Sequence, residues 1–111
     1  MNPCTFFKCL ADDVRLKLLL LVARVEEACV CDLMTALDID QPKTSRNLAK
    51  LRQCGILLDE RRGKWMFYRL NPELPNWAHD VIQQTAQQNP TYLDESLAKL
   101  TKCQTCSTKC C

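Results

Sequence analysis

Apolar residues recur at three- and four-residue spacing along most of the chain, which is the period of an amphipathic helix. The stretch from Asp13 to Arg24 differs because it is apolar on almost every side, and such a helix is expected at the centre of a domain. Asp12 or Asp13 is a suitable N-cap for it. The pattern predicts helices over about residues 3–11, 13–24, 31–37, 41–53 and 74–88, with another turn or two from Asn89 to Leu100.

A short turn and a hairpin complete the expected fold. Asp38-Ile39-Asp40 separates two of the helices, and Asp40 can cap the second, which Gly55 can stop. Strands are expected from Ile56 and over residues 64–70, with Arg61-Arg62-Gly63 at the tip. This order predicts a mainly α protein with a small β-hairpin, a winged helix-turn-helix. We expect residues 1–88 to form this domain, and residues 89–111 to form a C-terminal helical turn and a cysteine-rich tail.

Charge is concentrated in the middle of the chain. Residues 41–69 contain eight basic and two acidic side chains, a formal charge of +6, although the whole chain carries only +2. A concentrated positive segment on a near-neutral chain indicates a surface for a polyanion such as DNA.

The predicted helix 41–53 has a polar stripe that contains no acid. Arg46 on this stripe can contact guanine in a bidentate way, and Asn47 can pair with adenine. Leu48 and Leu51 lie on another face and can pack on the core. The candidate DNA-binding residues are Gln41, Lys43, Thr44, Ser45, Arg46, Asn47 and Lys50 on the helix, and Arg61, Arg62 and Lys64 at the hairpin tip.

Nine cysteines and a single histidine are present. The longest apolar run, residues 18–23, is too short to span a bilayer, and no signal-peptide pattern is visible, so we expect a cytoplasmic protein without a membrane partner. In a reducing compartment, such cysteine richness indicates metal binding or thiol chemistry rather than a disulfide framework. With only one histidine, a metal site here must be rich in sulfur, which favours soft ions.

Cys29 and Cys31 are the leading metal-ligand candidates. Residues two positions apart along a helix, such as Cys29 and Cys31, lie about 200° apart around its axis, so an intact helix cannot present both thiols to one small ion. Either they lie in a frayed helix start, or binding unwinds that start and distorts the element before the recognition helix. Further candidates are Cys4 and Cys9 in the first helix, and Cys103, Cys106, Cys110 and Cys111 in residues 101–111, which we expect to be mobile without metal.

Several motifs together resemble the ArsR/SmtB family of metalloregulatory repressors, and more closely its arsenic-resistance repressors. The similarity covers about residues 3–85. It is carried by Phe7-Lys8-Cys9-Leu10-Ala11-Asp12-Asp13-Val14-Arg15-Leu16, Cys29-Val30-Cys31-Asp32-Leu33, Gln41-Pro42-Lys43-Thr44-Ser45-Arg46-Asn47-Leu48, Leu51-Arg52 with Gly55, and Gly63-Lys64-Trp65 with Tyr68-Arg69-Leu70.

The resemblance implies a homodimer joined through its first and last helices. It also implies binding to double-stranded operator DNA without ligand, and release when As(III) or Sb(III) binds thiolates. Met34 departs from the family pattern, because the arsenic repressors have a third cysteine there. The third ligand could come from Cys4 or Cys9, as in a related branch that senses Cd(II), Pb(II) or Zn(II), from the tail, or from an exogenous group. The tail itself could be the sensor, a zinc-binding staple or a scavenging segment.

A different class of function stays open from the residues alone. Cys103-x-x-Cys106 has the spacing of a thiol redox motif, although no βαβ pattern accompanies it. A thiol redox protein or a metal-sequestering protein is therefore the alternative to a non-enzymatic repressor.

Overall fold

The computed structural model describes residues 1–105, the last five of them by their backbone alone. The elements follow in the order α1 (Pro3–Leu10), α2 (Asp13–Val25), β1 (Glu27–Cys29), α3 (Val30–Leu37), α4 (Gln41–Gln53), β2 (Leu57–Arg62), β3 (Trp65–Leu70), α5 (Asn76–Gln88) and α6 (Pro90–Thr105). This is the predicted winged helix-turn-helix, with a strand and a longer last helix that the sequence did not predict.

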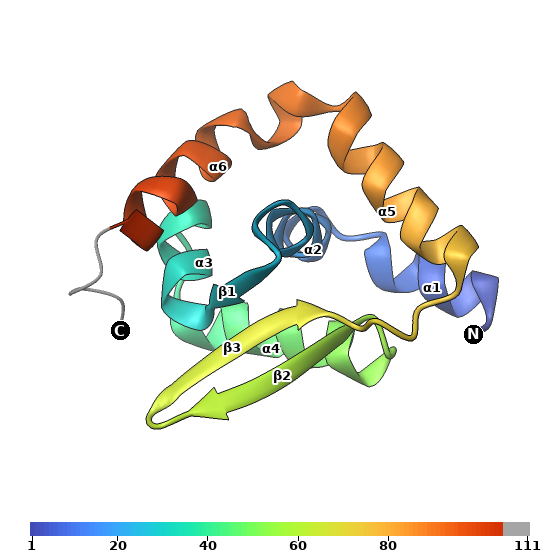
Figure 1. Ribbon diagram of the computed structural model, residues 1–111, viewed down its shortest axis with the longest axis horizontal. Helices are drawn as coiled ribbons and strands as arrows, with labels where there is room; N and C mark the ends of the chain where they lie inside the picture. Colours follow the sequence, from blue (N-terminus) through green and yellow to red (C-terminus); the bar gives the residue numbers. More distant parts are fainter. Residues whose placement is uncertain (106–111) are drawn as a thin grey trace.

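Helix α2 is the centre of the molecule. Asp12 caps it by accepting a hydrogen bond from the Arg15 backbone N–H at 3.0 Å. The five consecutive residues from Leu18 to Val22 expose none of their surface, so α2 is covered on all sides, as the apolar pattern predicted. Figure 1 shows α2 nearly end-on, with α5 and α6 arched over it and the hairpin below.

The sheet has three strands in the order β1-β3-β2, all antiparallel. Cys29 on β1 lies opposite Phe67 on β3, which in turn lies opposite Glu60 on β2. Only the hairpin was predicted from sequence. Strand β1 was missed because three residues are too few to show alternation, and pairing with β3 alone defines it.

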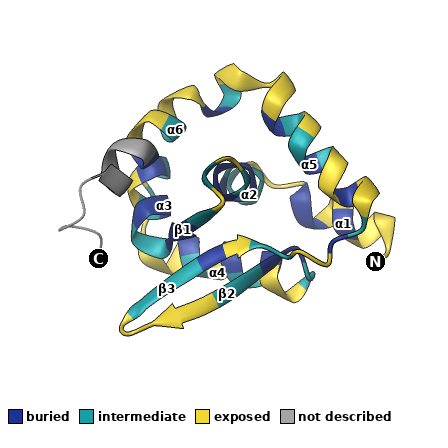
Figure 2. Ribbon diagram, viewed as in Figure 1, coloured by how far each residue is buried: buried dark blue, intermediate teal, exposed yellow. Residues whose placement is uncertain are grey.

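Helix α6 corrects the expected C-terminal region. It has 16 residues and packs mainly against α3, and also against α2 and α5. Leu93 and Leu100 are fully buried and Leu97 partly so, which is helical spacing. The prediction of one or two turns ending at Leu100 is wrong, because this apolar stripe finds a partner in α3. Figure 2 shows the same sidedness along the arch, where the outer surface is mostly exposed.

No helix in the described part of the chain combines the length and the apolar character needed to cross a bilayer.

Candidate functional site

Helix α4 presents a basic outer face beside the turn that follows α3. Its start is held by Asp40, whose Oδ1 accepts a hydrogen bond from the Lys43 backbone N–H at 2.8 Å. Asp38 makes the turn possible by adopting a left-handed conformation, at φ 56°, which aspartate tolerates better than most residues. The exposed side chains of this face are Gln41, Lys43, Arg46 and Lys50, with Ser45 half-buried between them.

Two of the predicted DNA-binding residues of α4 do not face solvent. Thr44 is fully buried and donates its hydroxyl to the Asp40 carbonyl at 2.8 Å. Asn47 is buried as well, and its Nδ2 donates to the Lys43 carbonyl at 2.9 Å. The expectation that both offer donors to DNA is therefore corrected: in this structure they bond to the backbone of their own helix. Polar side chains that satisfy their own helix backbone look the same in sequence as outward-facing ones.

The wing, residues 57–70, carries two exposed cations near its tip. Arg61 lies at the end of β2, and Lys64 follows Gly63, which takes φ +64° in the turn. The Lys64 ammonium lies 5.0 Å from the centre of the Trp65 ring. Both cations are exposed near the wing tip, and their contact with phosphates stays a prediction.

Arg62 is exposed on the wing, but its guanidinium is bonded to two carboxylates of the protein itself. Its guanidinium makes two bonds to the Glu27 carboxylate, at 2.8 and 2.5 Å, and a third to Glu60 at 3.0 Å. It also lies 4.7 Å from the centre of the Phe67 ring. These bonds raise the pKa of Arg62 above its ordinary value, and the same contact lowers the pKa of Glu60. Arg62 therefore ties β2 to β1 across β3, and the expected role of Arg62 in DNA contact competes with this ion pair.

The thiol pair lies where β1 gives way to α3. Cys29 is the last residue of β1 and has extended backbone angles, φ −80° and ψ 151°, whereas Cys31 is the second residue of α3. The Cys29 backbone N–H donates to Asp32 Oδ2 at 3.4 Å. Because only one of the two cysteines is helical, the 200° separation does not apply, and neither sequence alternative describes this site: Cys29 is the N-cap of an ordered helix rather than part of a frayed start.

Both thiols line a cavity of about 490 Å³. Its walls also include residues of α4 and of the wing. The predicted thiol site and the two predicted DNA-binding elements therefore border the same cavity. Cys29 is 1% exposed, so its thiol is reached through this cavity rather than from the outer surface. The lining residues are Cys29, Val30, Cys31, Met34, Gln41, Ser45, Arg61, Lys64, Trp65, Met66 and Tyr68.

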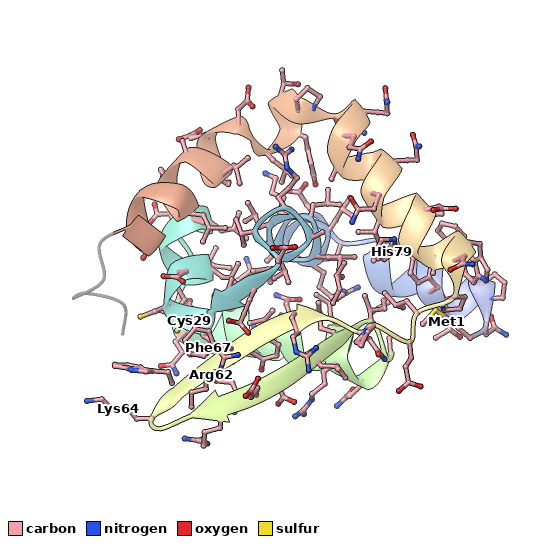
Figure 3. All side chains as sticks on the ribbon, in the orientation of Figure 1. Met1, Cys29, Arg62, Lys64, Phe67 and His79 are labelled. Atoms are coloured by element: carbon pink, nitrogen blue, oxygen red, sulfur yellow. The ribbon has the colours of Figure 1, made fainter. Side chains whose placement is uncertain are left out.

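The described residues bring no third metal ligand to this site. No three Cys, His, Asp or Glu side chains come together as a metal site within the described residues. Helix α1, which carries Cys4 and Cys9, lies across the molecule from Cys29, as the separation of Cys29 and Met1 in Figure 3 shows. Within one chain, α1 is too far from the Cys29–Cys31 pair for Cys4 or Cys9 to join it, and the expected joining stays a prediction that would need a second copy of the chain. Instead, Cys9 lies beside Cys54 at the end of α4.

The four tail cysteines are not placed by this structure. Cys103 falls in the backbone-only end of α6, and Cys106, Cys110 and Cys111 lie outside the described residues. His79 is exposed on α5, far from Cys29 (Figure 3).

Sequence comparisons identify relatives across most of the chain. The profile of the arsR family of bacterial regulatory proteins matches residues 12–57, from the start of α2 to the start of β2. The arsenic resistance transcriptional regulator ArsR2 of Pseudomonas putida is 49% identical over 100 residues, which is 90% of this chain and 87% of that protein. The arsenical resistance operon repressor of Escherichia coli K12 is 54% identical over 82 residues, covering 74% of this chain and 70% of that protein.

Solved structures agree with this relationship. Reduced HlyU of Vibrio cholerae superposes with a TM-score of 0.69 at 24% identity, over 77% of this chain and 85% of that one, which shows the shared fold. The antimony-specific transcriptional repressor AntR superposes with a TM-score of 0.64 at 29% identity, over 78% and 75% of the two chains. The chain belongs to the arsR family of bacterial transcriptional regulators, a family of DNA-binding winged helix-turn-helix proteins rather than of enzymes.

Proposed function

We propose that this protein represses an arsenic-resistance operon and leaves its operator when trivalent arsenic or antimony binds Cys29 and Cys31. The observation that carries the proposal is the shared cavity, because its walls include both thiols, Gln41 and Ser45 of α4, and the wing cation Lys64. The names of the relatives, which include arsenic-resistance regulators and an antimony-specific repressor, support the same ligand class.

Operator contact rests on the exposed faces of α4 and the wing. Arg46 and Lys50 are exposed one turn apart on α4, where a helix in the major groove meets base edges and phosphates. Arg61 and Lys64 add phosphate contacts from the wing. In a two-fold dimer, two such helices about 34 Å apart enter successive major grooves.

The ligand chemistry fits two thiols and an open cavity. Arsenite, As(OH)₃, can exchange two hydroxyl groups for the Cys29 and Cys31 sulfurs, and each new As–S bond releases one water that carries off the thiol proton. The third position keeps its hydroxyl group or takes an exogenous thiol, since Met34 offers only a neutral thioether.

Ligation can reach the DNA-binding elements directly. Cys29 pairs with Phe67 in the wing, and Cys31 lies in α3, which packs against α4. A shift of either sulfur toward one arsenic atom therefore moves groups that touch both elements. A coupling free energy of about 1–3 kcal/mol would weaken operator binding by about 5–150-fold.

The test is operator release read by fluorescence anisotropy. A labelled duplex from the DNA flanking the protein's own gene is bound by the wild-type chain and titrated with arsenite. Cys29→Ser and Cys31→Ser should bind this duplex as the wild type does but hold it at arsenite concentrations that release the wild type. Cys4→Ser is the matched control, because this exposed thiol lies outside the cavity and its loss should leave release unchanged.

Other outcomes would overturn parts of the proposal. Unchanged release in both cavity variants, together with its loss when the four tail cysteines become serine, would move the sensor to the tail. Release by Cd(II), Pb(II) or Zn(II) but not by arsenite would make the protein a sensor of those ions. Failure to bind any duplex from its own promoter region at low salt would remove the repressor function itself.

A further inference from the structure

A second pair of thiols lies between α1 and the end of α4, on the opposite side of α2 from the first pair. The Cys9 thiol donates to the Lys50 carbonyl at 3.7 Å, and the Cys54 backbone N–H donates to the same oxygen at 3.1 Å. The Lys50 carbonyl therefore accepts a hydrogen bond from each residue, although Cys9 and Cys54 are 45 positions apart in sequence. Cys9 is 7% exposed, whereas Cys54 is half-buried, so the pair is accessible to solvent on the Cys54 side.

The surroundings of this pair are basic. The two thiols line a cavity of about 330 Å³ together with Lys8, Arg15 and Lys50, and among the described residues neither a carboxylate nor an imidazole lines it. Arg15 is held in place by its Nε, which donates to the Cys9 carbonyl at 2.6 Å. Burial, with a hydrogen bond to Cys54, raises the pKa of Cys9 to about 12, while Arg15 and Lys50 oppose that rise.

The donor set decides what such a cavity can hold. Two sulfurs without a third ligand do not meet the four-coordinate demand of zinc. Soft thiolate ligands select ions such as Cu(I), which accept low coordination numbers. A monovalent ion between two thiolates leaves one net negative charge, which Arg15 and Lys50 are placed to balance.

We infer that Cys9 and Cys54 form a two-thiolate site for a monovalent soft cation of the Cu(I) and Ag(I) class. Binding replaces two S–H bonds by two S–metal bonds and releases two protons, without oxidation or reduction. The bound ion joins α1 to the residue that ends α4. This site is independent of Cys29 and Cys31 and does not rest on operator release.

Silver is the probe, because Ag(I) binds thiolates without redox chemistry. The test chain keeps only Cys9 and Cys54, with serine at the other seven cysteines, and is titrated with Ag(I) in chloride-free buffer. We expect one ion and two released protons per chain. The matched control carries Cys9→Ala and regains Cys4, so it has the same number of thiols, one exposed on α1 and one at Cys54, but not the pair. It should bind silver about 100-fold more weakly.

The wild-type background provides a second measurement that does not depend on the folding of the seven-serine chain. Cys9→Ala, Cys54→Ala and the double variant should each lose the same single equivalent of tightly bound silver. Equal silver affinity of the paired chain and its matched control would overturn the site. Additive losses in the double variant would overturn it too, because they mean that each thiol binds silver alone.

Discussion

At the scale of residues, exposure decides which polar side chains of α4 can meet a partner. Arg46 is exposed, whereas Thr44, two positions earlier, is buried and bonded to its own helix. A sequence pattern groups the two together, because both belong to the polar start of one helix. Substitution of Arg46 should therefore change DNA binding, whereas substitution of Thr44 should change the free energy of unfolding.

Arg46→Ala should weaken operator binding and lower the slope of log affinity against log salt by about one, with unfolding unchanged, since an exposed phosphate contact is lost. Thr44→Ala should instead lower the free energy of unfolding by about 1 kcal/mol, through loss of a buried hydrogen bond, and keep the salt slope. Anisotropy at several salt concentrations and urea unfolding measure the two quantities. A lower salt slope in Thr44→Ala would show that Thr44 contacts DNA after all.

At the scale of elements, β1 is the link between the thiols and the wing. It is three residues long, carries Cys29 at its end, and holds Arg62 of β2 through Glu27. Figure 3 shows Cys29, Phe67 and Arg62 close together in projection along the half of the hairpin nearer its tip. The bonds to Glu27 compete with a phosphate for the Arg62 guanidinium, so we expect this ion pair to weaken any contact of Arg62 with DNA.

Glu27→Gln should release Arg62 toward DNA and raise the salt slope of operator binding by about one. The control is the same substitution in an Arg62→Ala background, where the gain should vanish. If the gain persists without Arg62, it comes from the removal of a negative charge in general, and the ion pair does not restrain the wing. A chain that binds no DNA in any background would instead refute the operator proposal.

At the scale of the whole molecule, α5 and α6 pack against α2, and α6 also packs against α3 of the helix-turn-helix. Tyr92 of α6 donates a hydrogen bond to the Asp13 carboxylate at the start of α2, and the Lys17 ammonium lies 5.1 Å from the centre of its ring. Burial, with the bond to Asp13, raises the pKa of Tyr92 to about 12, and the same bond lowers the pKa of Asp13.

Tyr92→Phe should remove a pH-dependent part of the stability. The pKa of Tyr92 is raised in the folded state, so the stability from its proton is fully present below pH 10, the ordinary pKa, and is lost as the pH rises toward about 12. The difference in unfolding free energy between wild type and Tyr92→Phe should shrink across this range in urea unfolding. A difference that stays constant from pH 9 to pH 12 would contradict the assigned bond.

An aromatic cluster on α1 and α5 is the proposed dimer surface. Phe7 is 50% exposed and Trp77 38% exposed, and their ring centres lie 6.3 Å apart above the buried Phe6. Exposed aromatic side chains gathered on one face are typical of a protein interface. The resemblance implies a homodimer joined through the first and last helices of the chain, and α1 is the first of these.

Phe7→Glu should shift the protein toward monomers and weaken operator binding, because a charge replaces apolar contact at the proposed interface. Sedimentation velocity across a range of concentrations measures the first effect, and anisotropy measures the second. Thr5→Glu is a charge-matched control on the same helix. A Phe7→Glu chain that associates as the wild type does would place the dimer contact elsewhere.

The sequence alone determined the local structure and the kind of chemistry. Its apolar period, the N-caps at Asp12 and Asp40, and the stop at Gly55 predicted α2, α4 and the hairpin, and the structure confirms them, because caps and amphipathic periods depend on residues close in sequence. The apolar stripe of α6 was also present in the sequence, but its partner α3 lies about 60 residues away.

Only the tertiary structure decided which of these groups act together. The pairing of β1 with β3, the ion pair of Glu27 with Arg62, and the meeting of Cys9 with Cys54 all join residues far apart in the chain. The burial of Thr44 is likewise a result of packing. Sequence reasoning found Cys29 and Cys31, but only the fold puts them in one cavity with the start of α4 and the wing, because the cavity forms where three separate elements meet.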